Sequence, residues 1–188
     1  MKKSRVIATV LAFSMGGLIS AFALLAPSLP VRNQAVPGHP VWTEVQWPFP
    51  MDEWGQGKAF RCDTEACGTE VSLYIRAKIG FCNCTTGVSD DDELDRLSDY
   101  NLMGDKPSVL AAGHPINVAW MKGRSRPYSL AKTKTGQSAL ALAFNDHCDA
   151  VVATAVIARD VPMASEPIVI EFLNSQTIVR WTQKTLNL

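Results

Sequence analysis

The stretch VSLYIRAKI, residues 71–79, decides the fold class. Its apolar side chains occupy every second position and alternate with Ser72, Tyr74, Arg76 and Lys78. Because successive side chains of a strand point to opposite faces of a sheet, this period of two predicts a β-strand. The preceding stretch KAFRC, residues 58–62, predicts a second strand, with residues 63–68 as the turn between them.

Other parts of the chain are also expected to form strands. Residues 41–49 contain two tryptophans and Pro48, which suits an edge strand because proline cannot donate a hydrogen bond to a neighbouring strand. Residues 138–144 and 150–158 are apolar runs, and the second is rich in valine. A strand is therefore predicted for the second run.

A helix is predicted after Ser89, which precedes the acidic residues 90–93. Serine suits an N-cap, and carboxylates in the first turn interact favourably with the helix dipole. Leu94, Leu97 and Leu102 would then face the core. Strands mixed with separate helices indicate an α+β fold, with helices packed on an antiparallel sheet and a hydrophobic helix preceding it.

The C-terminal region leaves two interpretations open. Residues 165–167, Ser-Glu-Pro, are typical of a helix start with proline in the first turn. The β-branched residues at 168–170 and 178–179 would instead allow a hairpin across residues 174–175. We favour helix, because the large apolar residues after position 171 fit a helical stripe better than an alternation.

The N-terminus predicts export. A basic cluster, Lys2, Lys3 and Arg5, precedes residues 6–26, which carry no charge. The segment 1–26 is either a signal peptide cleaved after Ala23 or a retained membrane anchor, since about 20 apolar residues span a bilayer. Residues 27–40 contain four prolines and predict a stiff tether. Residues 41–188 then form one domain, either periplasmic or held at the inner membrane and facing the periplasm.

Composition excludes several protein classes. The chain has 188 residues, with 18 Lys and Arg balanced by 18 Asp and Glu. This zero net charge argues against a nucleic-acid partner, because nucleic-acid binders usually carry a basic excess. The chain contains no phosphate-binding glycine loop and no HExxH zinc motif. With three histidines and no nucleophile-elbow glycines, a hydrolase is the least favoured class.

Five cysteines carry the clearest chemical signal: Cys62, Cys67, Cys82, Cys84 and Cys148. In an exported protein the default is disulfide bonding. We expect at least one bridge to join the 62/67 pair to the 82/84 pair, and Cys148 to be a buried thiol in a turn before a strand. The alternative is a thiol or metal site, because Cys82 and Cys84 as thiolates could bind copper or zinc.

A basic segment follows Trp120 and is expected to form a hairpin or loop. Its members are Lys122, Arg124, Arg126, Lys132 and Lys134. The segment is either a solvated face or a surface for a protein partner.

Three segments carry a resemblance to a family of uncharacterised, exported or membrane-anchored bacterial proteins. They are WPFPMDEWGQGKAFRC at 47–62, KIGFCNC at 78–84 and DDDELD at 90–95. The resemblance covers most of residues 41–188 and implies no catalytic residues. Trp54, Gly55 and the following hairpin more weakly resemble the α+β fold of PsbP and Mog1, which implies a sheet with helices packed on it.

The functional expectation follows from these features together. We expect a membrane-associated periplasmic accessory or binding protein. Such a protein needs a membrane anchor, here residues 6–26, a tether and a domain held by disulfide bonds, and each of these has support in the sequence. The alternative is a periplasmic protein that handles thiols, copper or zinc through Cys82 and Cys84.

Overall fold

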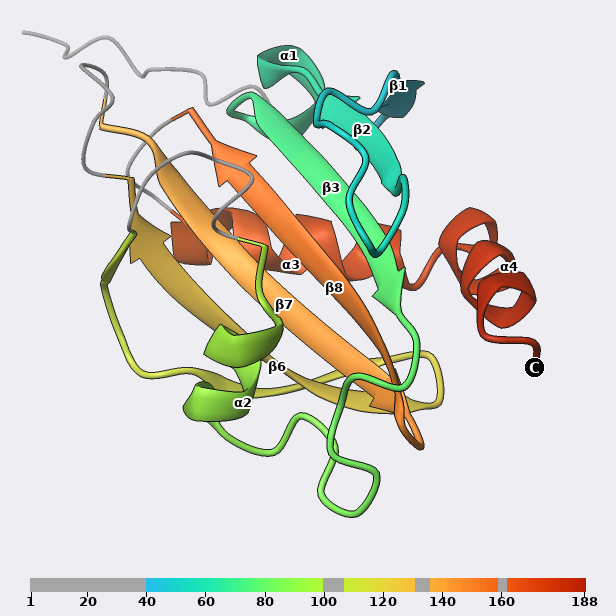
Figure 1. Cartoon of the computed structure of the whole chain (residues 1–188). Coiled ribbons are helices and arrows are strands. Elements are labelled where there is room, and N and C mark those ends of the chain that lie inside the picture. Colours follow the sequence, from blue (N-terminus) through green and yellow to red (C-terminus); the bar gives the residue numbers. More distant parts are fainter. Residues whose placement is uncertain (1–39, 100–106, 131–135, 159–161) are drawn as a thin grey trace, which may run out of the picture. The chain divides into compact units, whose positions relative to one another are not determined.

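The computed structural model describes residues 40–99, 107–130, 136–158 and 162–188, and all of them belong to one compact unit of the chain. Their strands form one antiparallel sheet of order β1-β2-β3-β8-β7-β6-β4, in which β5 also pairs with β6 (Figure 1). The predicted α+β class is therefore confirmed. The elements are β1 (Trp42–Val45), β2 (Lys58–Cys62), α1 (Thr64–Cys67), β3 (Val71–Lys78), α2 (Asp91–Leu97), β4 (Ser108–Val109), β5 (His114–Val118), β6 (Met121–Ser129), β7 (Ser138–Asp146), β8 (Asp149–Ile157), α3 (Pro162–Leu173) and α4 (Gln176–Thr185).

Strand β3 follows the predicted alternation and pairs with β2 on one side and β8 on the other. Val71, Leu73 and Ile75 are fully buried against the core that includes α3 and α4. On the opposite face, Arg76 and Lys78 are only 2% and 5% exposed. The polar face of this strand is therefore covered by protein at Arg76 and Lys78, and these two charges must find partners within the fold.

The hairpin β7–β8 lies at the centre of the sheet and is buried on both faces. The large side chains of β7, such as Leu142 and Phe144, pack with α3 and α4, whereas Ala141 and Ala143 pack with α2. Figure 1 shows the two helix layers, with α3 behind the sheet and α2 in front of it. Burial on both faces explains why residues 138–144 and 150–158 are continuous apolar runs rather than alternating strands.

The C-terminal region is helical, as favoured from the sequence, but it forms two helices. Ser175 caps α4 by accepting a hydrogen bond from the Ile178 backbone N–H, which separates α4 from α3. The predicted start at Ser165 is wrong, because α3 begins at Pro162. A proline at the first helical position loses no internal hydrogen bond, whereas Pro167 lies inside the helix on its exposed side.

Helix α2 is confirmed, with its cap one residue later than predicted. The Asp90 side chain, and not that of Ser89, accepts from the Glu93 backbone N–H at 2.8 Å. Leu94 and Leu97 are fully buried against the sheet, as expected. Leu102 lies outside the described residues.

Strand β1 is an edge strand, as predicted, but it covers only residues 42–45 of the predicted range 41–49. Trp42 stacks on Phe172 of α3 with ring centroids 4.6 Å apart. The predicted segment 1–26 and residues 27–39 of the predicted tether 27–40 lie outside the described residues. Within the described ranges, no helix is long and apolar enough to cross a membrane.

Candidate functional site

The cysteines pair differently from the prediction. The structure contains the disulfides Cys62–Cys67 and Cys84–Cys148, and Cys82 is a free, buried thiol. The expected bridge between the 62/67 and 82/84 pairs is therefore wrong, as is the expectation that Cys148 is a thiol.

Local geometry and strand register explain both pairings. Cys62 and Cys67 lie at the end of β2 and in helix α1, with Cα atoms 6.0 Å apart, so they bridge within one turn of chain. Lys78 pairs with Ala150 in the antiparallel β3–β8 ladder. The residues that follow β3 therefore lie beside those that precede β8, where Cys148 is found.

The Cys84–Cys148 disulfide argues against the hypothesis that Cys82 and Cys84 bind copper or zinc together. Because Cys84 is bonded to Cys148, Cys82 and Cys84 cannot act together as two thiolate ligands in this state. Among the residues that the structure describes, no group of three or more His, Cys, Asp or Glu side chains is placed to hold a metal ion.

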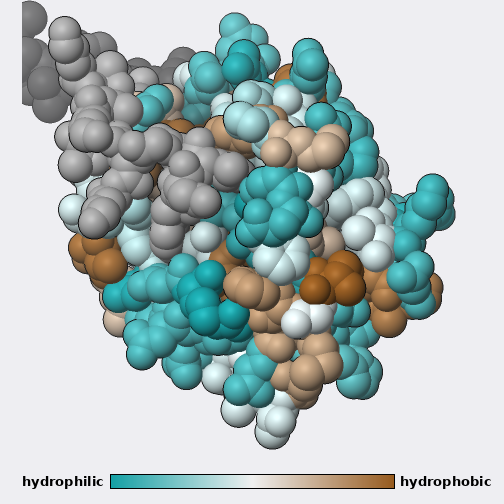
Figure 2. All heavy atoms as spheres, viewed as in Figure 1, coloured by the Kyte–Doolittle hydropathy of each residue, from teal (hydrophilic) through white to brown (hydrophobic). Residues whose placement is uncertain are grey.

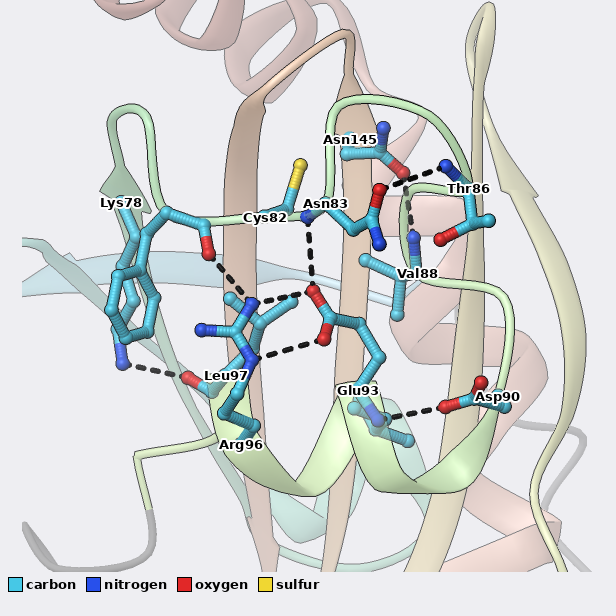
Figure 3. Close-up of polar contacts among 12 residues, drawn as sticks. Lys78, Cys82, Asn83, Thr86, Val88, Asp90, Glu93, Arg96, Leu97 and Asn145 are labelled. Atoms are coloured by element: carbon cyan, nitrogen blue, oxygen red, sulfur yellow. Dashed lines mark hydrogen bonds and ion pairs between the residues drawn. The ribbon is translucent and has the colours of Figure 1, made fainter.

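The loop after β3 is held against α2 by charged side chains (Figure 3). Arg96 donates to both carboxylate oxygens of Glu93, at 3.0 and 2.6 Å, and to the Phe81 carbonyl at 2.7 Å. Glu93 in turn accepts from the Asn83 backbone N–H at 3.1 Å. The hydrogen bond from Arg96 lowers the pKa of the Glu93 carboxyl, so this carboxyl stays ionised.

A cleft of about 460 Å³ opens beside this loop on the α2 face of the sheet. Figure 2 shows that polar and apolar residues lie side by side on this face. The lining comes from the loop after β1, the end of β3 with the loop that follows it, and the end of α2: Asp52, Glu53, Trp54, Arg76, Lys78, Phe81, Arg96, Ser98 and Asp99. Three cations, three carboxyls and two aromatic rings thus meet in one place.

Arg76 organises the buried side of the cleft. Its Nε and Nη2 donate to the two carboxylate oxygens of Asp99, both at 2.6 Å, and its Nη1 donates to both oxygens of Asp52 at 2.7 Å. The hydrogen bond from Arg76 lowers the pKa of Asp52. Burial alone would lower the pKa of Arg76, but its bonds to Asp99 and Asp52 outweigh burial and raise it. Arg76 and Asp52 therefore stay charged.

Lys78 and two aromatic rings complete the cleft. The Lys78 ammonium donates to the Leu97 carbonyl at 2.6 Å and lies 2.8 Å from Asp99. It also lies 5.6 Å from the Trp54 ring centroid and 5.7 Å from that of Phe81, within the range of cation–π attraction. The ring centroids of Trp54 and Phe81 are 4.7 Å apart. Both rings are half-buried, so they offer apolar surface to a ligand.

No pattern in the sequence identified this cleft as a site. Arg76 and Lys78 occupy the polar positions of a correctly predicted strand, and their partners Asp52 and Asp99 are distant in the chain. Two basic residues at alternate positions of a strand were the one available signal. That signal does not distinguish a solvated face from a buried one.

The predicted basic segment is only partly described. Of the two predicted forms, hairpin or loop, the structure shows a hairpin: residues 121–129 form strand β6, which pairs antiparallel with β5 and β7. Lys132 and Lys134 lie outside the described residues. Arg124 bonds Asp91 at 2.5 Å, and Arg126 bonds Asp95 at 2.9 Å. The two arginines are thus held by α2, while Lys122 is exposed. The role of this segment as a partner surface remains a prediction.

Comparison with known proteins adds no functional assignment. The chain matches no protein-family model, and no curated protein matches it. The resemblances described above therefore remain predictions, and a functional proposal must rest on the geometry of the molecule.

Proposed function

We propose that this protein is an exported, membrane-associated periplasmic domain that binds a partner protein through the cleft between β3 and α2. Two disulfides support export, because such bonds persist mainly in oxidising compartments. Membrane association rests on the uncharged run at residues 6–26.

The observation that carries the binding role is the buried charge network under an open cleft. Arg76 and Asp99 have side-chain exposures of 2% and 8%, and Lys78 has 6%. Burying ions costs several kcal/mol each, and a well-packed apolar replacement is often at least as stable. The network holds the loop after β1, the end of β3 and the end of α2 in one arrangement, which pre-organises the walls of the cleft.

The rim offers the groups that a partner would contact. Arg76 and Lys78 are already engaged, whereas Glu53 is exposed and makes no polar contact with the described residues. Trp54 and Phe81 add aromatic surface, and the Arg96 side chain is 44% exposed. Aromatic and arginine side chains are enriched among residues that dominate binding energy. We therefore place the contact at the rim rather than at Arg124 and Arg126.

Site-specific photo-crosslinking tests this proposal. A photoreactive amino acid at position 53 should capture one defined protein in intact cells, and the same group at exposed Lys184 on α4 should not. Adding Trp54→Ala should abolish the position-53 crosslink. The matched change Trp120→Ala, at a tryptophan that is 45% exposed on the β5–β6 turn, should leave it intact. Equal crosslinking at both positions, or loss only with Trp120→Ala, would refute the cleft as the contact.

Topology is tested separately. A reporter that folds only in the periplasm should be active when it is fused after Leu188. N-terminal sequencing of the purified protein distinguishes cleavage after Ala23 from a retained anchor. A fusion that is active only in the cytoplasm would overturn the proposed location.

A further inference from the structure

We propose that Cys82, Cys84 and Cys148 form a thiol–disulfide exchange site, in which Cys148 can be bonded to either Cys84 or Cys82. The reactant of such a site is a disulfide that reaches the molecular surface at Cys84. This inference is independent of the cleft and of its partner.

The backbone already places Cys82 beside Cys148. The Cys82 N–H donates to the Cys148 carbonyl at 3.1 Å, and this backbone hydrogen bond joins the loop after β3 to the turn between β7 and β8. A backbone hydrogen bond keeps the two residues close, and a disulfide bridges residues whose Cα atoms are about 4.4–6.8 Å apart. A Cys82–Cys148 bond therefore requires little movement of the backbone.

The Cys82 side chain also points in the required direction. Its sulfur lies 3.1 Å from the carbonyl oxygen of His147, the residue before Cys148. Figure 3 shows the sulfur directed toward the end of the β7–β8 hairpin and away from Glu93 and Arg96. The thiol thus lies at the β7–β8 turn that carries Cys148.

The exchange step balances without another reagent. The Cys82 thiolate attacks the Cys148 sulfur, the Cys82–Cys148 bond forms, and the Cys84–Cys148 bond breaks. Cys84 leaves as a thiolate and takes up the proton that Cys82 released. The step converts a thiol that is 6% exposed into one at Cys84, which is an exposed position. The Cys84 thiolate can then attack an external disulfide and release one thiol from it.

The surroundings of Cys82 keep the exchange slow at neutral pH. Burial raises the pKa of the Cys82 thiol, and the charges of Glu93 and Asp149 raise it further, while Arg96 opposes them. The other titratable groups at this end of the hairpin are His147, whose side chain is 89% exposed, and Asp146, which lies 2.7 Å from it. Since only the thiolate attacks, the rate of exchange should rise with pH.

Alkylation of the native, full-length protein tests the proposal. Iodoacetamide is added at pH 7 and at pH 8.5, samples are quenched in acid, and the modified cysteine is identified by peptide mass spectrometry. We expect alkylation at Cys84, accompanied by a Cys82–Cys148 disulfide, and a rate at least several-fold higher at pH 8.5. The Cys82→Ser variant should lose this alkylation. Alkylation at Cys82, no alkylation over hours at pH 8.5, or an unchanged rate in Cys82→Ser would overturn the proposal.

A second variant tests the same geometry without measuring a rate of alkylation. In Cys84→Ser, the folded protein should contain a Cys82–Cys148 disulfide and no free thiol, while Cys62–Cys67 is unchanged. A folded Cys84→Ser protein in which Cys82 and Cys148 both react with iodoacetamide would contradict the proposed geometry.

Discussion

Replacing Arg76 with methionine should be the most destabilising change in the cleft that leaves side-chain volume nearly unchanged. The variant removes four hydrogen bonds to Asp52 and Asp99 and leaves Asp99 buried, with 8% of its side chain exposed. Removing one partner of a buried ion pair costs about 3–5 kcal/mol, because the remaining charge is no longer compensated.

The structure places the expected loss at the lower end of that range. Asp99 keeps Lys78 at 2.8 Å, and Asp52, with 26% of its side chain exposed, can recover contact with water. We therefore expect the free energy of unfolding to fall by about 3 kcal/mol at pH 7. For a chain of this size, that corresponds to a fall in Tm of about 6–12 °C.

Urea unfolding followed by tryptophan fluorescence and circular dichroism measures this loss. Arg96→Met is the matched control, because the Arg96 side chain is 44% exposed and pairs with Glu93 three residues away. An exposed pair of this kind contributes at most about 1 kcal/mol. If Arg76→Met loses no more stability than Arg96→Met, the buried network does not hold the walls of the cleft.

The pH dependence gives a second readout. Arg76 lowers the pKa of folded Asp52 below its unfolded value, so this interaction stabilises the protein above the unfolded pKa. The contribution is lost as pH falls below about 4 and through the lower folded pKa. The Arg76→Met variant lacks this interaction at every pH. The difference in free energy of unfolding between the variant and the wild type should therefore become smaller as the pH falls. A difference that is constant from pH 7 to pH 3 would contradict this assignment.

Three further outcomes are expected. In urea unfolding, Cys148→Ser should lower the free energy of unfolding by about 4 kcal/mol and Cys62→Ser by about 2 kcal/mol. The reason is that the Cys84–Cys148 and Cys62–Cys67 bridges close loops with sequence separations of 64 and 5. Equal losses in the two variants would contradict this dependence on loop length. Arg124→Glu should lower the Tm and weaken the docking of α2, because it places a carboxylate against Asp91; an unchanged Tm would show that this ion pair contributes nothing. Gly123→Ala should reduce the soluble yield and the Tm, because the new Cβ atom would lie 2.1 Å from a backbone oxygen of β7. A Tm equal to that of the wild type would refute this close approach.

Much of the fold could be predicted because it follows from local patterns. The alternation at residues 71–79, the acidic start of α2 and the valine-rich run at 150–158 each reflect how neighbouring residues fill one face of an element. Errors arose where two local signals competed. The helix start at Ser165 was wrong because Pro162, which is equally suited to a first turn, lies three residues earlier.

The site could not be predicted in the same way. Periodicity identified Arg76 and Lys78 as one face of a strand, but whether α2 or water covers that face depends on how elements distant in sequence pack. Asp99 and Asp52 reach Arg76 from 23 and 24 residues away, and no spacing rule connects them.

The sequence alone determined the α+β class and the strand at residues 71–79, and it favoured a helical C-terminus and disulfide bonds, because hydrophobic periodicity, capping and cysteine content are short-range or compositional properties. Tertiary structure alone decided which cysteines pair and which charges are buried. The antiparallel register that sets Lys78 opposite Ala150 brings Cys84 to Cys148 across 64 residues of chain. Such a register results from packing the whole sheet between its helices, and no short stretch of sequence encodes it.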